Sequence, residues 1–260
     1  MIARRRRVFL LDVEGTIAPI SLVSEQLFPH ARAHFEEFLK NHLGDPGVQE
    51  NLGLLRDENW HDHEPGVPRI VSLEKLRDDP DYSSGMQAVS SGGTALREAE
   101  LKYLFCLMDR DRKSTALKSL QGKIWKAGFE SGELKGTLFA DVPEALKRWA
   151  ARGQVAIYSS GSVEAQRLLF RHSIFGDLTA LLAAHFDART GPKAASASYA
   201  TIATAMSAVP EELLFFSDVV QELDAAREAG CVTRLVVREG NAPVEDAHGH
   251  EIVESFEGVL

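Results

Sequence analysis

Two acidic residues near the start of the chain, Asp12 and Glu14, are of types that could carry out metal-assisted phosphoryl transfer. They follow the apolar run of residues 8–11 and come just before Gly15. Two carboxylates at this spacing can share a hard divalent cation such as Mg²⁺, which prefers oxygen ligands. A carboxylate can also act as a nucleophile and form a phosphorylated intermediate. Taken alone, the same residues fit a strand that ends in a solvated acidic turn equally well.

Four polar residues later in the chain could complete such a site: Ser159, Ser160, Lys193 and Asp218. The two serines precede Gly161, where backbone N–H groups can approach an anion at the start of a helix. Lys193 could bring an ammonium group to the same anion. Each of these residues alone is ordinary, because lysines are mostly exposed and serines are common in turns. Together with the two acids they suit phosphoryl transfer, in which positioning and charge neutralisation lower the barrier.

The residue types also indicate a division of roles. Asp12 would attack phosphorus in line and form an aspartyl-phosphate. Glu14 would protonate the leaving oxygen and then activate the water that hydrolyses the intermediate. Asp12 and Asp218, with a backbone carbonyl near Glu14, would form a Mg²⁺ site that keeps positions open for water and substrate.

Short apolar runs, rich in β-branched and aromatic residues, predict the strands that position these side chains. The runs cover residues 8–11, 154–158, 213–216 and 232–237, with a weaker candidate at residues 185–186. Helical patterns between the later runs are typical of a Rossmann-like parallel sheet flanked by helices, an α/β fold. Because parallel strands end at one edge of the sheet, Asp12, Ser159 and Asp218 would lie side by side there.

The stretch between the first strand and Gly136 contains helical patterns and no convincing strand. The expected helices cover residues 22–42, 48–59, 70–76, 94–109 and 115–130. An all-helical insert at this point would form a lid over the active edge of the sheet, and lids exclude water and complete sites. We therefore predict an α/β catalytic core of residues 1–20 and 136–260 and a helical cap domain of residues 21–135.

Local signals give further expectations about helix ends. Ser114 and Asp141 are predicted N-caps, and Pro143 would lie in the first turn of the helix that Asp141 begins. A helix is also predicted over residues 193–207. Residues 238–250 are rich in Gly, Asn, Pro, Asp and His and are predicted to be a loop after the last strand.

Composition narrows the classes of function. The 260 residues carry a net charge of −9, which argues against a nucleic-acid-binding protein. The basic run of residues 4–7 abuts the first strand, so a solvated lead-in is favoured over a targeting signal. No apolar run approaches the ~20 residues that a membrane span needs. Cys106 and Cys231 resemble small buried apolar residues in a reducing compartment, and we expect a cytoplasmic protein.

Other polar groups resemble functional clusters less closely. The alternating histidines of residues 61–64 lack the i, i+4 spacing of helical zinc sites, so a solvated loop is favoured. His248 and His250 are interpreted in the same way. Glu222 and Asp224 lie on the helix that follows the fourth predicted strand. One of them could support a metal ligand, or both could face solvent, and the sequence favours neither.

A set of ordered motifs resembles those of the haloacid-dehalogenase superfamily of phosphohydrolases. It comprises Asp12-Val13-Glu14-Gly15-Thr16, Ser160, Lys193 and Ser217-Asp218. The second acid is Glu14, whereas most phosphatases of that superfamily have Asp. This form of the first motif, together with residues 158–166 and 112–122, resembles the acireductone synthase family. Members of that family are the bifunctional enolase-phosphatases of methionine salvage.

The resemblance implies a haloacid-dehalogenase-like fold and a two-step, Mg²⁺-dependent reaction. The implied substrate is 2,3-diketo-5-methylthiopentyl 1-phosphate, a small phosphorylated diketone, which is enolised and then dephosphorylated to acireductone. By position, Asp12, Glu14 and Asp218 would hold one Mg²⁺ per chain, Glu14 through its backbone carbonyl. The residues that would hold substrate are Ser159, Ser160 and Lys193. The family also implies a cytosolic monomer.

Two other functions stay open from the sequence. A phosphatase of the same superfamily that acts on another small phosphate ester would keep the same core, since substrate choice depends on the cap. A non-catalytic binding module would keep the fold and lose the nucleophile, whereas Asp12 is present here. Fold alone does not decide between these functions.

Overall fold

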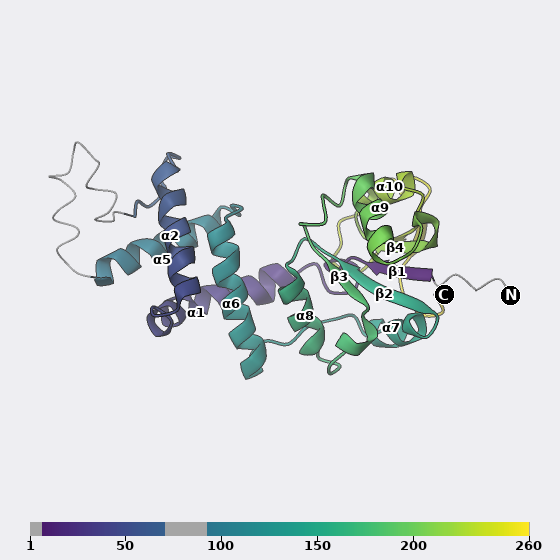
Figure 1. The fold of residues 1–260 in the computed structure, drawn as a ribbon, viewed down its shortest axis with the longest axis horizontal. Helices are drawn as coiled ribbons and strands as arrows, with labels where there is room; N and C mark the ends of the chain where they lie inside the picture. Colours follow the sequence, from purple (N-terminus) through teal and green to yellow (C-terminus); the bar gives the residue numbers. More distant parts are fainter. Residues whose placement is uncertain (1–6, 71–92, 260) are drawn as a thin grey trace. The chain divides into compact units, whose positions relative to one another are not determined.

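The computed structural model describes residues 7–70 and 93–259, so most of the predicted helix at residues 70–76 and the start of the basic run lie outside the described residues. The chain divides into two compact units (Figure 1). One, the α/β unit, consists of Met1–Leu27 and Gly128–Leu260. The other, the helical unit, consists of Phe28–Ala127 and has only helices among its described elements.

A six-stranded parallel sheet forms the centre of the α/β unit, in the order β3-β2-β1-β4-β5-β6. The strands are β1 (Arg7–Leu11), β2 (Gly153–Tyr158), β3 (Ala184–Phe186), β4 (Leu213–Ser217), β5 (Val232–Val236) and β6 (Glu251–Val253). The predicted parallel α/β fold is confirmed. β5 is not the last strand, because the three residues of β6 add one more at the edge; two of them are exposed, so no apolar run marks β6.

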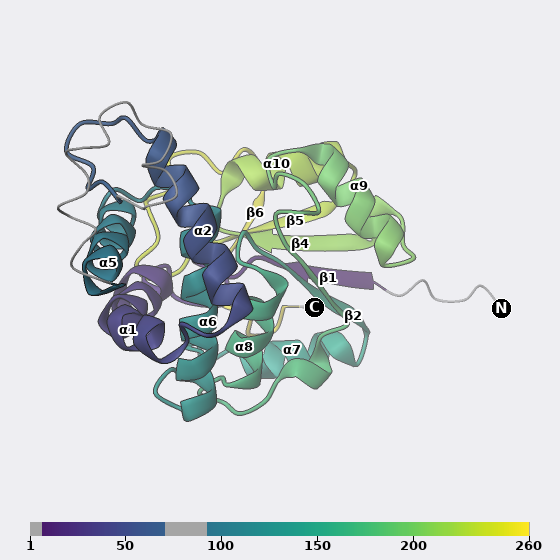
Figure 2. The ribbon, with the colours of Figure 1, turned by 60° about the vertical axis from the view of Figure 1, so that its left-hand side comes forward.

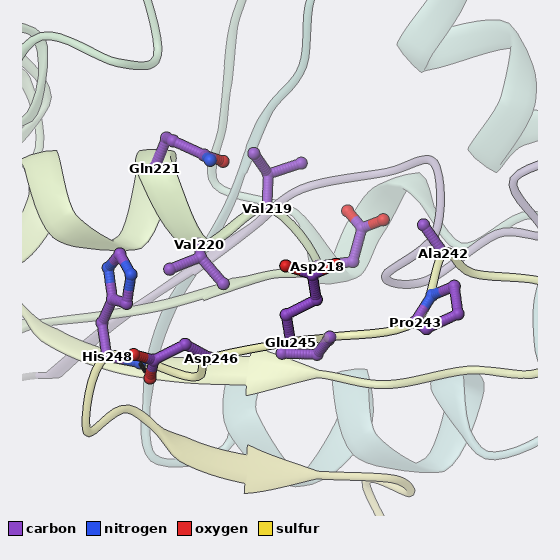
Figure 3. A pocket seen from close by; sticks show the side chains of 10 residues that line it. Asp218, Val219, Val220, Gln221, Ala242, Pro243, Glu245, Asp246 and His248 are labelled. Carbon is purple, nitrogen blue, oxygen red and sulfur yellow. Dashed lines mark hydrogen bonds between the residues drawn. The ribbon is translucent and has the colours of Figure 1, made fainter.

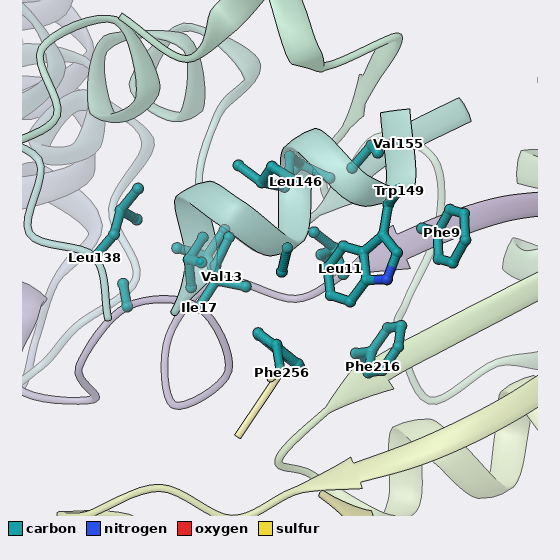
Figure 4. Packing of buried hydrophobic residues seen from close by; sticks show 14 of the residues in the cluster. Phe9, Leu11, Val13, Ile17, Leu138, Leu146, Trp149, Val155, Phe216 and Phe256 are labelled. Carbon is teal, nitrogen blue, oxygen red and sulfur yellow. The ribbon is translucent and has the colours of Figure 1, made fainter. Parts of the chain in front are cut away.

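Continuous apolar strands form because both faces of the sheet are covered by helices. On one face, α7 (Val142–Ala150) and α8 (Val163–Arg171) pack against alternate strand residues; on the other, α9 (Ser196–Ala205) and α10 (Val220–Glu228) do so (Figure 2). Trp149 of α7 is fully buried, with its ring 5.3 Å from Phe9 and 5.1 Å from Phe216 (Figure 4). This packing fixes β1 between β2 and β4, and therefore fixes the residues that follow these strands.

The helical unit has its own buried apolar core. Its described helices are α1 (Phe28–Asn41), α2 (Pro46–His61), α5 (Gly93–Asp109) and α6 (Thr115–Ser131). A π-helix over Leu22–Leu27 precedes α1, so the helix predicted from residue 22 changes type partway. Ser114 caps α6 as predicted, since its Oγ accepts a hydrogen bond from the N–H of Leu117 at 3.2 Å. No helix among the described residues is both long enough and apolar enough to span a bilayer.

Two local expectations in the α/β unit need correction, and both concern polar side chains. Asp141 is the N-cap residue of α7 and Pro143 lies in its first turn, as predicted, but the Asp141 side chain makes no capping hydrogen bond; its carboxylate binds Arg238 instead. The helix predicted from residue 193 begins only at Ser196, so Lys193 lies in the preceding turn. A helix-bound lysine would project from the helix surface, whereas this turn places its ammonium at the edge of the sheet.

Candidate active site

Asp12 lies at the centre of the site because β1 lies at the centre of the sheet. Its N–H continues the strand pairing by donating to the carbonyl of Phe216 at 3.0 Å. On the other side of β1, Ser159 follows β2 and is likewise buried. Asp12 is only 4% exposed, although it is an acid at a strand end. The predicted meeting of residues far apart in sequence therefore takes place at the carboxyl edge of the sheet.

Lys193 joins two acids from different elements. Its Nζ lies 2.7 Å from Oδ1 of Asp12 and 2.6 Å from Oε2 of Glu222 on α10. The turn that carries Lys193 is held by tyrosine hydroxyls: Tyr199 donates to the carbonyl of Lys193 at 2.7 Å, and Tyr158 donates to that of Gly191 at 2.8 Å. The fold therefore holds a buried ammonium beside the carboxylate of Asp12.

Glu222 is the site residue whose role sequence reasoning left undecided. Besides binding Lys193, its carboxylate accepts a hydrogen bond from Ser217 Oγ at 3.0 Å. It lies in the first turn of α10, whereas Asp218 lies in the bend between β4 and that helix. The signal that could have found Glu222 is therefore only its closeness in sequence to Asp218, because the helical spacing rule does not extend outside the helix. Asp224, the alternative, binds His248 and His250 instead.

Glu14 belongs to a tight turn, residues 13–18, which we call the acid loop. Ser159 Oγ donates to Oε2 of Glu14 at 3.3 Å and accepts from the N–H of Gly161 at 3.1 Å. Ser159 is therefore in contact with an acid of the cluster. Ser160 is exposed and makes no hydrogen bond or ion pair within residues 7–70 and 93–259. It follows Ser159 at the sheet edge but, within those residues, has no hydrogen bond or ion pair with the other predicted site residues.

Gly15 is required by the approach of Asp218. Its φ of +72° is one that residues with a side chain rarely adopt. A Cβ placed on Gly15 would lie 2.2 Å from Oδ2 of Asp218, far inside contact distance. The glycine therefore lets the carboxylate of Asp218 lie directly against the acid loop that carries Glu14.

The cluster holds more negative than positive charge. Burial and the charge of Asp12 raise the pKa of Glu14 and of Glu222 above the ordinary range. The same two causes raise the pKa of Asp218 to about 7. Burial opposes the charge of Lys193, but Asp12 and Glu222 outweigh it and raise the pKa of the ammonium. In the described part of the chain, these four carboxylates share a single cation, an arrangement that a further cation would stabilise.

The donor set fits a hard divalent cation. Oδ1 of Asp12 already accepts from Lys193 and from the N–H of Val13, each at 2.7 Å. Its Oδ2 has only a 3.4 Å contact from Ser217 Oγ. That oxygen, the carboxylate of Asp218 and the oxygens of Glu14 are all of the type that Mg²⁺ binds. The residues present thus agree with a magnesium site.

A cavity of about 450 Å³ opens beside Asp218, between the N-terminal end of α10 and residues 242–248 (Figure 3). Apolar and acidic side chains share its walls. They are Asp218, Val219, Val220, Gln221, Ala242, Pro243, Val244, Glu245, Asp246 and His248. The cavity shows that Asp218 can be reached from solvent through the α/β unit.

The residues interpreted as solvated loops are mostly exposed, but Asp62 and His250 are buried and paired. Asp62 is 6% exposed and binds Arg112 and the hydroxyl of Tyr103. His250 is also 6% exposed; its Nε2 lies 3.1 Å from Asp224, and its Nδ1 is hydrogen-bonded to Thr233 at 2.7 Å. These groups join structural elements within one unit, and none of them contacts the acid cluster around Asp12.

The chain is similar to known proteins in both sequence and structure. The haloacid dehalogenase-like hydrolase family model matches residues 6–230. A Synechococcus elongatus protein named enolase-phosphatase E1 is 47% identical over 237 residues, covering 91% of this chain and 90% of that protein. A Physcomitrium patens protein, named as a probable bifunctional methylthioribulose-1-phosphate dehydratase/enolase-phosphatase E1, is 42% identical over 98% of this chain and 48% of its own length. The crystal structure of the UTR4 protein of Saccharomyces cerevisiae aligns with a TM-score of 0.68 at 33% identity, covering 97% of this chain and 99% of that one.

Proposed function

The chain belongs to the haloacid dehalogenase-like hydrolase family and, within it, to the enolase-phosphatases, and from this premise we propose that it enolises and dephosphorylates a phosphorylated diketone of methionine salvage. The family resemblance inferred from the sequence motifs is confirmed. The observation that carries the proposal is the buried Asp12–Lys193–Glu222 group at the end of β1. It pairs a carboxylate nucleophile with a fixed ammonium, as phosphoryl transfer requires.

The proposed roles follow from these contacts. Asp12 attacks phosphorus, and Lys193 neutralises charge on the phosphoryl oxygens. Glu222 and Ser217 keep Lys193 and Asp12 in place. Glu14, whose pKa burial raises, is suited to hold a proton and deliver it to the leaving oxygen. Ser159 orients Glu14, and the adjacent Ser160 is proposed to contact the substrate.

The proposed substrate is 2,3-diketo-5-methylthiopentyl 1-phosphate. The name of the Physcomitrium relative joins enolase-phosphatase to a dehydratase of methylthioribulose 1-phosphate. Loss of water from a ketose phosphate of that kind leaves a diketone phosphate, so the two activities would fit consecutive steps. We propose that Glu14 serves the enolisation as well, because its side chain reaches further than that of the usual Asp.

Phosphatases of this family are typically Mg²⁺-dependent. We propose that Asp12, Asp218 and the backbone carbonyl of Glu14 hold one Mg²⁺. Bound there, the ion would polarise substrate oxygens and so acidify the neighbouring C–H. Asp218 and Glu14 would contribute oxygens, while Lys193 keeps one side of Asp12 occupied.

We also propose that the helical insert is the cap domain that selects the substrate and excludes water, with the α/β residues 1–20 and 136–260 as the catalytic core. A second candidate, a phosphatase for another small ester, would differ in this insert. We further propose that the protein acts as a monomer, which sedimentation at assay concentrations would test.

The decisive experiment supplies the diketone phosphate with Mg²⁺, then with a chelator, and follows two signals. Phosphate release reports hydrolysis, and ultraviolet absorbance reports the enediol product. We expect both signals with Mg²⁺ and neither with the chelator. Phosphate release without enediol would leave a plain phosphatase. As a readout independent of activity, Mg²⁺ should raise the Tm of the wild-type protein and not that of Asp218→Asn.

A further inference from the structure

Three hydrogen-bond donors from other segments of the chain bind three consecutive backbone carbonyls of the acid loop. Within the loop, the carbonyl of Val13 accepts from the N–H groups of Ile17 and Ala18 at 2.9 Å each. The carbonyls of residues 15–17 instead point out of the turn, where each accepts a hydrogen bond from another segment. Backbone carbonyls paired in this way resist displacement, because an unpaired buried carbonyl is costly.

Two of the three donors are side chains of the segment that follows β5. Asn241 Nδ2 donates to the carbonyl of Gly15 at 2.9 Å, and Arg238 Nε donates to that of Thr16 at 3.2 Å. The third donor is the backbone N–H of Phe139, on the carbonyl of Ile17 at 3.0 Å. Residues 238–250 were predicted only as loop, yet this segment supplies two of the three donors that bind the acid loop.

Arg238 is itself rigidly held. Its guanidinium binds both oxygens of Asp141, at 2.8 Å and 3.1 Å. It lies over the rings of Phe139 and Phe256, with its Cζ 4.6 Å and 4.5 Å from the ring centroids. Its side chain is 7% exposed. Asp141 accepts a further hydrogen bond from the N–H of Phe256 at 2.7 Å, so both members of the ion pair are immobilised.

We propose that Arg238 and Asn241 are positioning residues that hold Glu14 in the geometry needed for proton transfer. The proposal rests on the proposed function, in which Glu14 protonates the leaving oxygen. The tied residues 15 and 16 directly follow Glu14, and Gly15 lies against Asp218. Release of these carbonyls would let Glu14 shift relative to the phosphoryl group. Misplacement of about 1 Å in a catalytic group can cost on the order of a hundredfold in rate.

A planar guanidinium is needed for this role. Lysine carries the same charge, but its single ammonium cannot bind both oxygens of Asp141 and the carbonyl of Thr16 in one plane. Arg238→Lys therefore removes the tie while keeping the charge. Arg234→Lys is the matched control, because Arg234 on β5 also binds an acid, Glu251 at 3.0 Å, and a carbonyl, that of Thr233 at 3.0 Å.

The test compares phenyl phosphate with p-nitrophenyl phosphate in the full-length protein with Mg²⁺. The p-nitrophenolate group leaves without a proton, whereas phenolate is far more basic and benefits from a general acid. We expect Arg238→Lys and Asn241→Leu to lower kcat for phenyl phosphate about tenfold, with KM little changed. Turnover of p-nitrophenyl phosphate should stay within about twofold, and Arg234→Lys should alter neither rate.

Equal losses on the two esters would overturn the proposal, because they would indicate a general structural role. Unchanged rates in both variants would overturn it as well. In a Glu14→Gln background, Arg238→Lys should have no further selective effect on phenyl phosphate. The outcome is separable from the proposed function: a protein that fails to convert the diketone phosphate can still show, or lack, this leaving-group dependence.

Discussion

The two units of this protein bury acidic side chains in opposite ways. In the helical unit, Asp62 has its own arginine, Arg112, and Glu100 is bound by Arg56 at 2.6 Å. In the α/β unit, Asp12 and the three carboxylates around it share one lysine among the described residues. Both groups are removed from water, so burial penalises charge in both. They differ in whether each charge has a partner.

That difference distinguishes buried acids that stabilise the fold from buried acids that are suited to cation binding or proton transfer. Burial works to raise the pKa of Asp62, but hydrogen bonds from the N–H of Glu64, Tyr103 and Arg112 outweigh it and hold the pKa below its ordinary value. Around Asp12, burial and the charge of Asp12 outweigh a backbone hydrogen bond and the charge of Lys193, and the pKa of Asp218 rises to about 7. Perturbed carboxylates with excess charge are typical of sites that bind cations or transfer protons. The Asp141–Arg238 pair shows that full pairing also occurs in the α/β unit, outside the cluster of carboxylates that share Lys193.

The largest expected effect comes from Asp12→Asn. This change removes the proposed nucleophile, so we expect phosphate release to fall by on the order of a thousandfold or more. The Tm should stay the same or rise, because one of four mutually repelling carboxylates is gone. Steady-state kinetics and calorimetry on the same preparation measure both quantities. Retained turnover would exclude the covalent mechanism, and a large loss of Tm would show that Asp12 is a structural acid like Asp62.

Within the cluster of carboxylates around Asp12, Glu14→Asp tests whether the length of this acidic side chain matters. We expect enolisation, measured as solvent hydrogen exchange into the diketone phosphate, to fall about a hundredfold. Hydrolysis of phenyl phosphate should fall less than about tenfold, because the shortened acid can still serve a nearby oxygen. Equal losses in the two assays would contradict the idea that the longer side chain is needed for proton transfer at carbon.

The matched substitution in the helical unit is Asp62→Asn. It breaks a buried charge-assisted pair, so we expect the free energy of unfolding to fall by about 2 kcal/mol. The kcat of the folded enzyme should stay within about twofold, since Asp62 bears no proposed catalytic role. Urea unfolding and activity at low temperature measure the two effects. A variant with normal stability and lost activity would contradict the view that buried acids of the helical unit only stabilise the fold.

The smallest effect concerns His185 of β3, whose ring is hydrogen-bonded to Gln166 and pairs with no acid among residues 7–70 and 93–259. Burial lowers its pKa from 6.5 to about 4. Between these values the unfolded chain takes up a proton that the folded chain does not, so stability is complete above pH 6.5 and is lost as pH falls toward 4. We expect His185→Gln to remove on the order of 1 kcal/mol of that pH dependence, after allowance for partial exposure. Urea unfolding of both proteins at pH 7 and pH 5 measures the change in unfolding free energy between the two pH values. An equal change in the two proteins would show that the histidine is not responsible.

Much of the fold could be predicted because strands covered on both faces are continuous apolar runs. β1, β2 and β4 were located in this way, and the order of acids, serines and lysine at their ends indicated the chemistry. The predicted edge strand at residues 185–186 is present as β3. Three-residue β6 was missed, because pairing with β5 rather than its own composition makes it a strand.

The sequence by itself determined the chain order of the polar groups and the apolar periodicity, since both are local properties of the chain. Only the tertiary structure decided which polar groups meet. In the folded protein the carboxylate of Asp141 binds Arg238 rather than capping a helix, and Glu222 binds Lys193. The acid loop accepts a hydrogen bond from Asn241. Apolar burial is non-directional and leaves its pattern in the sequence, whereas a hydrogen bond depends on the final positions of two atoms that the chain brings together only on folding.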